Sequence, residues 1–115
     1  MLVVDSQVHI WGADTRERPW PKRAQAQRPN VSAKVSALPC YSTGTYPYKE
    51  LHGYIRRVYD AFGPQRLFWG TDLSRSPIPY RQHVTMFTEE IPWLTADDKE
   101  WIMGRAVCEW LGWRS

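Results

Sequence analysis

The stretch LHGYIRRVYDAFGPQRLFWGTD, from Leu51 to Asp72, decides the fold because it places an amphipathic helix directly before a short apolar strand. Its apolar side chains recur at spacings of four, three and four residues, at Leu51, Ile55, Val58 and Phe62. Such a one-sided stripe is typical of a helix with one buried face. The Gly-Pro pair that follows ends a helix. We therefore predict a helix over residues 48–62 and a buried strand over residues 67–69.

A second strand is predicted before this helix. Residues 31–38 alternate small apolar side chains with Ser and Lys, which is the period of two expected for a strand. Strand, helix and strand then follow one another as a βαβ unit, whose strands should be parallel and connected with a right-handed crossover.

The ends of the chain predict further elements. Residues 2–4 form a short apolar run that ends at Asp5, and Val8 and Ile10 continue it, as in a buried first strand. Residues 12–30 are polar and contain three prolines, so we expect a long loop there. A helix is predicted from Tyr80 to about residue 90.

A last helix is predicted from Thr95, which can form a capping box with Asp98 three residues later. Gly112 should end this helix. We expect its inner stripe to consist of four residues, Trp101, Ile102, Ala106 and Trp110.

Composition limits the class of protein. A chain of 115 residues with 43% hydrophobic residues is expected to form one globular domain. The net charge of +3 is not clustered as in a nucleic-acid-binding face, and no apolar run approaches the length of a membrane span, so we expect neither partner. Cys40 and Cys108 show no metal or disulfide spacing, which indicates a reducing, cytoplasmic location.

Polar residues just beyond parallel strands are the first candidates for chemistry, since reactive groups gather at the carboxyl ends of such strands. Asp72 follows the strand over residues 67–69. A carboxylate there can bind a metal or act as a general base, but Asp also favours helix N-caps and turns, and the local pattern leaves both readings open.

Two further pairs of residues are candidates. Gln7 and His9 alternate along an extended segment and would face one common site, although a lone histidine is more often structural. Lys34 and Ser36 lie on the polar side of a strand, where Lys34 could neutralise an anionic substrate or simply face solvent. Two other histidines, His52 and His83, are interpreted as surface or packing residues.

With these residues in place, the chain resembles the amidohydrolase-related family, the metal-dependent hydrolases also called amidohydrolase family 2. The segment DSQVHIW, from Asp5 to Trp11, is similar to the family's first strand, in which a histidine usually stands where Gln7 does. The segment DAFGPQRLFWGTD, from Asp60 to Asp72, closely resembles its late-strand motif. The Lys34-Val-Ser36 segment and the terminal WLGW are also similar to the family's closing section.

The resemblance implies an α/β fold, a TIM-like (β/α) barrel that is here incomplete. It keeps the first strand, over residues 1–11, and the last strands and helices, over residues 31–115, joined at a loop or deletion junction over residues 12–30. It further implies that Asp72 is the catalytic base, at or near the metal, and that His9 is a metal ligand, with Gln7 as a poor third. Lys34 and Ser36 are the candidates for contact with substrate, from their place on the polar side of a strand. The cofactor would be a divalent metal, zinc or manganese, if the chain is active.

The resemblance leaves the activity open. A complete barrel takes about 250 residues, and a catalytic zinc normally has three protein ligands. We therefore expect a hydrolase of a small carboxylate, lactone or amide whose activity is impaired by the missing central strands. The alternative is a non-catalytic remnant that acts as an oligomerising or binding protein. A third interpretation is that the reading frame is partial.

Overall fold

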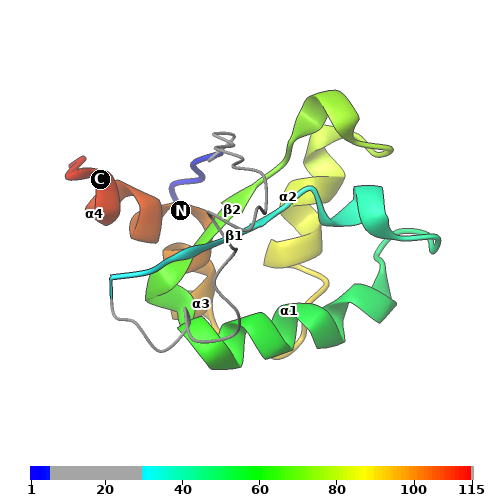
Figure 1. Cartoon of the computed structure of the whole chain (residues 1–115). Helices are drawn as coiled ribbons and strands as arrows, with labels where there is room; N and C mark the ends of the chain where they lie inside the picture. The colour runs from blue at the N-terminus through cyan, green and yellow to red at the C-terminus, as the bar shows by residue number, and fades with distance from the viewer. Residues whose placement is uncertain (6–29, 115) are drawn as a thin grey trace, which may run out of the picture.

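The computed structural model describes residues 1–5 and 30–114, and its centre is a pair of parallel strands. Strand β1 (Ala33–Ser36) pairs with β2 (Leu67–Gly70), with Ala33 opposite Leu67 and Ser36 opposite Gly70. Helix α1 (Lys49–Phe62) connects the two strands and runs beneath them in Figure 1. The predicted βαβ unit and its parallel pairing are confirmed.

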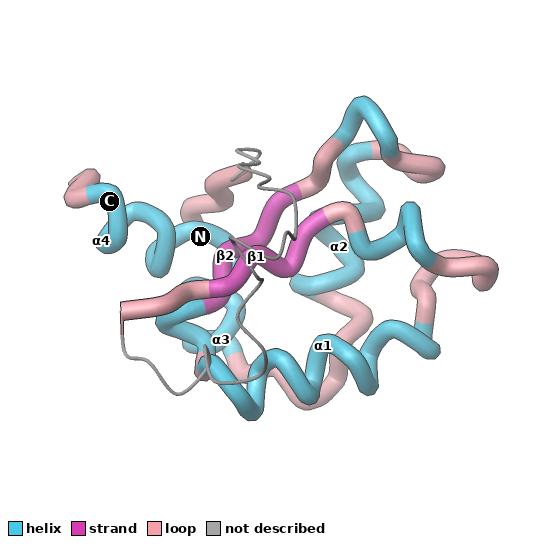
Figure 2. The backbone as a smooth tube through the Cα atoms, in the orientation of Figure 1, coloured by secondary structure: helices cyan, strands magenta, loops and turns pink. Residues whose placement is uncertain are grey.

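Shorter helical elements, separated by loops and turns, follow one another along the rest of the described chain, as the coloured tube in Figure 2 shows. Three are 3-10 turns, which are η1 (Leu38–Tyr41), η2 (Pro64–Arg66) and η3 (Leu73–Arg75). The predicted helix from Tyr80 is present as α2 (Tyr80–Thr88). The last helical stretch consists of α3 (Ala96–Glu100), a π-helical turn η4 (Trp101–Arg105) and α4 (Ala106–Leu111).

The two faces of the sheet pack against different helices. Val35, Leu67 and Trp69 belong to the main core, together with Ile55 of α1 and with apolar side chains of α2 and η4. Phe68 points to the opposite face, because side chains alternate along a strand, and packs with Ala106 and Val107 of α4. Helices therefore cover both faces of this short sheet.

The strand predicted over residues 31–38 is shorter than expected. Strand β1 ends at Ser36 because Ala37 adopts a left-handed conformation (φ 57°), which turns the chain out of the sheet. It begins only at Ala33, since β2 starts at Leu67 and offers no earlier partner.

The predicted first strand is wrong for the part that the structure describes. Residues 1–5 form no regular strand, and the remaining predicted positions, residues 6–11, lie outside the described residues. The N–H of Val4 donates to the carbonyl oxygen of Met103 at 2.7 Å, so this segment bonds to the π-helical turn instead of extending the sheet. Gly104 permits the approach, because a Cβ there would lie 2.6 Å from the carbonyl oxygen of Leu2.

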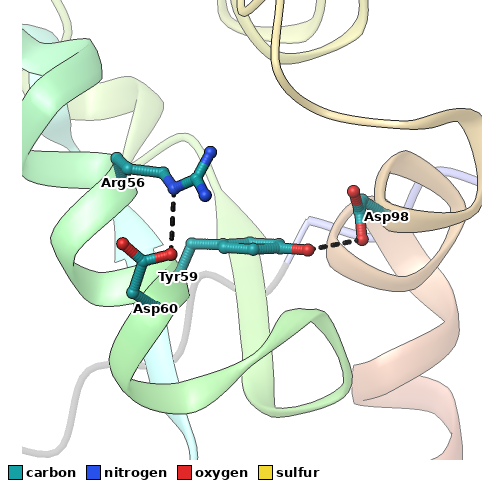
Figure 3. Close-up of polar contacts among 4 residues, drawn as sticks. All are labelled: Arg56, Tyr59, Asp60 and Asp98. Atoms are coloured by element: carbon teal, nitrogen blue, oxygen red, sulfur yellow. Dashed lines mark hydrogen bonds and ion pairs between the residues drawn. The ribbon is translucent and has the colours of Figure 1, made fainter.

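Helix α3 begins with the predicted capping box. The Thr95 hydroxyl accepts from the N–H of Asp98 at 3.1 Å, and the N–H of Thr95 donates to the Asp98 carboxylate at 2.9 Å. Tyr59 of α1 donates its hydroxyl to the same carboxylate, as Figure 3 shows. Burial raises the pKa of Asp98, but the bonds from Thr95 and Tyr59 outweigh it and leave the pKa below its usual value.

The inner stripe predicted for the last helix is only partly correct. Ile102 and Ala106 are buried, but Trp110 is 66% exposed, with its ring centroid 5.9 Å from that of Phe68. The π-helical turn η4 is the reason, since a π turn holds one more residue than an α turn and rotates all later side chains around the axis. Met103, Val107 and Cys108 point inward instead. Gly112 ends the helix in a left-handed conformation, as predicted.

We expect Thr95→Ala to lower the free energy of unfolding by about 1 kcal/mol, because the N–H of Asp98 loses its side-chain acceptor. Thr95→Ser keeps the hydroxyl and should unfold like the wild type. Urea unfolding followed by circular dichroism measures both. Equal losses in the two variants would show that the hydroxyl is not the stabilising group.

Within residues 1–5 and 30–114, none of the helices has the length and apolar character needed to cross a membrane.

Candidate functional site

The candidate site lies where the two parallel strands end. Ser36 and Gly70 are opposite each other at the last paired position, and Thr71 and Asp72 follow Gly70 directly. Gly70 and Thr71 are buried, and Asp72 is only 6% exposed to solvent. A carboxylate is therefore held at the carboxyl end of the sheet and largely away from water.

The structure bears on the alternative that Asp72 is a helix cap. Asp72 occupies the N-cap position of η3, and its carbonyl oxygen accepts from the N–H of Arg75 at 2.9 Å. Its carboxylate makes no capping bond to the turn. Asp72 thus caps the turn through its backbone carbonyl, and its side chain takes no part in the cap. The residue adopts a left-handed conformation (φ 50°), which is uncommon outside glycine and concentrates at functional sites.

Lys34 lies close enough to Asp72 to interact with its charge. Burial lowers the pKa of Lys34, while the nearby negative charges of Asp72 and Asp5 raise it and oppose that effect. Lys34 stands one position before Val35 and so points to the other face from the main core. Ser36 shares that side of the strand by alternation and is half-buried. The predicted substrate roles of Lys34 and Ser36 remain predictions.

Asp5 was not singled out from the sequence as a site residue, although the structure places it beside Asp72. One of its carboxylate oxygens accepts from the N–H of Thr71 at 3.0 Å, and the other accepts from the Thr71 hydroxyl at 2.6 Å. A signal was present, since Asp5 ends an apolar run just as Asp72 follows one. Its partner lies 66 residues away, so local spacing could not indicate the pairing.

Helix α2 contributes two further groups, Tyr80 and His83, which lie three residues apart on one helical face. His83 is only 3% exposed, and its Nε2 contacts the hydroxyl of Ser76. Burial lowers the pKa of His83, while Asp5 and Asp72 raise it. Burial likewise raises the pKa of Tyr80, and Asp5 adds to that increase. His83 is thus a packed residue, as expected, but one that also interacts with both site carboxylates.

A metal ion at this site would need several side-chain ligands. Asp5 uses both carboxylate oxygens on Thr71, and the Nε2 of His83 is engaged by Ser76. In the part of the chain that the structure describes, no three His, Cys, Asp or Glu residues come together as a metal would require. The described side chains alone therefore do not fit a metal. Gln7 and His9, the other predicted ligands, lie outside the described residues.

Comparison with known proteins places the chain in a family. A family model described as "Amidohydrolase" matches residues 4–106. Among solved structures, the described fold is similar to the crystal structure of an amidohydrolase from Burkholderia multivorans with bound zinc. The TM-score is 0.66 at 22% sequence identity, over 77% of this chain and 34% of that one. This chain therefore spans about a third of that protein's length. A search of curated proteins finds no match. Because the family model covers most of its residues, the chain belongs to the amidohydrolase family.

Proposed function

We propose that this chain is a hydrolase of a small amide, lactone or carboxylate substrate, built on the first segment and the closing βαβ section of an amidohydrolase barrel. In this proposal residues 1–11 derive from the barrel's first strand, residues 12–30 are the junction, and residues 31–115 form its final section. The central strands are missing. The single observation that carries the proposal is the burial of Asp72 at the carboxyl end of β2, in a left-handed conformation.

The proposed chemistry uses Asp72 as a general base. Its carboxylate accepts a proton from water while the water oxygen attacks the substrate carbonyl carbon, and it returns that proton to the leaving amine or alkoxide when the C–N or C–O bond breaks. Burial keeps this carboxylate away from bulk water. Lys34 attracts a carboxylate group of the substrate, with Ser36 as a neighbouring hydrogen-bonding group. An ammonium group of a half-buried lysine interacts more strongly with an anion than a fully solvated one does.

A divalent metal, zinc or manganese, belongs to this proposal because the amidohydrolase from Burkholderia multivorans contains zinc. Its proposed ligands are His9, Gln7 and Asp72. Since the described side chains do not form a metal site by themselves, binding depends on Gln7 and His9. An amide is a poorer ligand than an imidazole, so we expect weak metal binding and slow hydrolysis.

Metal content tests the proposal directly. In equilibrium dialysis against an excess of zinc, we expect the wild-type chain to bind close to one equivalent of zinc above the free zinc of the buffer, by elemental analysis. His9→Ala should lose the metal. His52→Ala should retain it, because His52 lies on α1 and its ring bonds to the carbonyl oxygen of Pro47. A wild-type chain without metal and without activity on amides or lactones would overturn the proposal.

A second candidate function is an oligomerising protein without catalysis. The observation that favours it is a group of exposed apolar side chains at the end of α4, which consists of Trp110, Leu111 and Trp113 at 66%, 43% and 59% exposure. In addition, each of the described strands has only one neighbour, and open strand edges favour pairing with a second copy. The proposed occupant of this surface is a second copy of the chain.

Multi-angle light scattering tests this candidate. We expect a stable oligomer for the wild type and a shift toward monomer for Trp113→Ser. Tyr54→Ser is the matched control, since Tyr54 is similarly exposed, at 64%, but lies on α1. A wild-type chain that remains monomeric at high concentration would contradict the oligomer.

A further inference from the structure

We propose that Asp5 is a positioning residue for Asp72, an inference that rests on the proposed function wherever catalysis is concerned. Asp5 contacts Asp72 indirectly, through Thr71. Both polar hydrogens of Thr71, on its amide and its hydroxyl, are donated to the Asp5 carboxylate, one to each oxygen. Thr71 is fully buried, so water cannot replace Asp5 as the hydrogen-bond acceptor for its amide and hydroxyl unless the structure opens.

The bond matters because of where Thr71 stands in the chain. It is the last residue before Asp72, which adopts a left-handed backbone conformation. That conformation is unfavourable for a residue with a Cβ, so it persists only where the surrounding structure restrains it. The two charge-assisted hydrogen bonds from Thr71 to Asp5 restrain the backbone directly before Asp72. They fix the peptide from which the Asp72 side chain projects.

Asp5 also shares the electrostatic surroundings of Asp72. The charge of Asp5 raises the pKa values of Lys34, Tyr80 and His83, and Asp72 has the same effect on two of them, Lys34 and His83. Both carboxylates are therefore close to Lys34 and His83. A residue that only stabilised the N-terminal segment would not need to lie among them.

The N-terminal segment is built to hold Asp5 in this place. The residue before it, Val4, bonds to the carbonyl oxygen of Met103, and its side chain packs with Phe68 and Ala106. Gly104 leaves room for the backbone of Leu2. These contacts of Leu2 and Val4 together place the Asp5 carboxylate next to Thr71.

The test measures the conformation of Asp72 and catalysis separately. In isotope-labelled full-length chain, the nuclear Overhauser effect between the amide and α protons of Asp72 reports positive φ, because the two protons are then close. We expect this signal to be strong in the wild type and in Thr71→Ser, which keeps both donors. It should weaken in Thr71→Val, which lacks the hydroxyl but keeps its shape, and fall in Asp5→Ala to the low intensity of a residue with negative φ.

Hydrolysis supplies the second readout. If Asp5 positions Asp72, kcat should fall about 10- to 100-fold in Thr71→Val with KM unchanged, and Thr71→Ser should restore it. An unchanged Asp72 signal in Asp5→Ala and Thr71→Val would overturn the inference, and should Asp5→Ala not fold, Thr71→Val decides alone. A wild-type chain without hydrolysis would refute the proposed function, while the Asp72 signal would still decide the role of Asp5.

Discussion

Asp72→Asn is expected to lower the rate of hydrolysis by about 10²- to 10⁴-fold, the usual contribution of a general base. Asn has nearly the size of Asp and tolerates the left-handed conformation that Asp72 adopts, so the fold should be preserved. The amide cannot accept a proton from water at neutral pH. Steady-state kinetics on a lactone or amide substrate measures the loss.

Asp97→Asn is the control for this prediction. Asp97 is an exposed carboxylate in the first turn of α3, outside the two strands and outside the turn that carries Asp72. Its replacement should leave kcat unchanged. Comparable activity of Asp72→Asn and the wild type would show that another group activates the water.

Trp69→Ala is expected to cause the largest loss of stability. Trp69 lies in the middle of β2 opposite Val35, is 1% exposed, and its ring meets the ring of Tyr80 edge-on at 6.1 Å. Truncating a buried aromatic side chain to Ala costs about 3–5 kcal/mol. Whole domains are stable by only about 5–15 kcal/mol, so this variant should be largely unfolded or unfold at much lower urea.

Circular dichroism is the appropriate probe, because removing a tryptophan alters the fluorescence by itself. Trp113→Ala removes a tryptophan that is 59% exposed and should change the free energy of unfolding by less than about 0.5 kcal/mol. If both variants unfolded at the same urea concentration, Trp69 could not be a central core residue.

The spacing of apolar and capping residues was sufficient to predict the elements whose pattern lies within a few consecutive residues. Helix α1, strand β2 and the Thr95 capping box follow from spacings within a few residues, and all are present. Trp110 was misplaced because periodicity assumes an unbroken α-helix. The π-helical turn before it leaves no clear mark in the sequence.

The candidate site was predictable only where a polar side chain lies on a predicted strand or directly after one. Lys34, within one predicted strand, and Asp72, just beyond the other, could be found in this way, and the structure places them close enough for their charges to interact. Asp5 and His83 could not, because their relation to Asp72 depends on tertiary packing between the N-terminal segment, β2 and α2. Asp5 was instead assigned to a first strand, although its side chain bonds to Thr71 and its neighbour Val4 bonds to Met103.

The attachment of Asp5 to Thr71 has a consequence for the order of events during synthesis. A ribosome makes the amino-terminal residues first, yet the groups that receive them, Thr71 and Met103, are made 66 or more residues later. Closing so long a loop costs entropy that only the finished core can offset. The βαβ unit can form as soon as β2 has emerged, whereas the carboxylate of Asp5 must wait for almost the entire chain. The candidate site is therefore completed last, by the residues that were translated first.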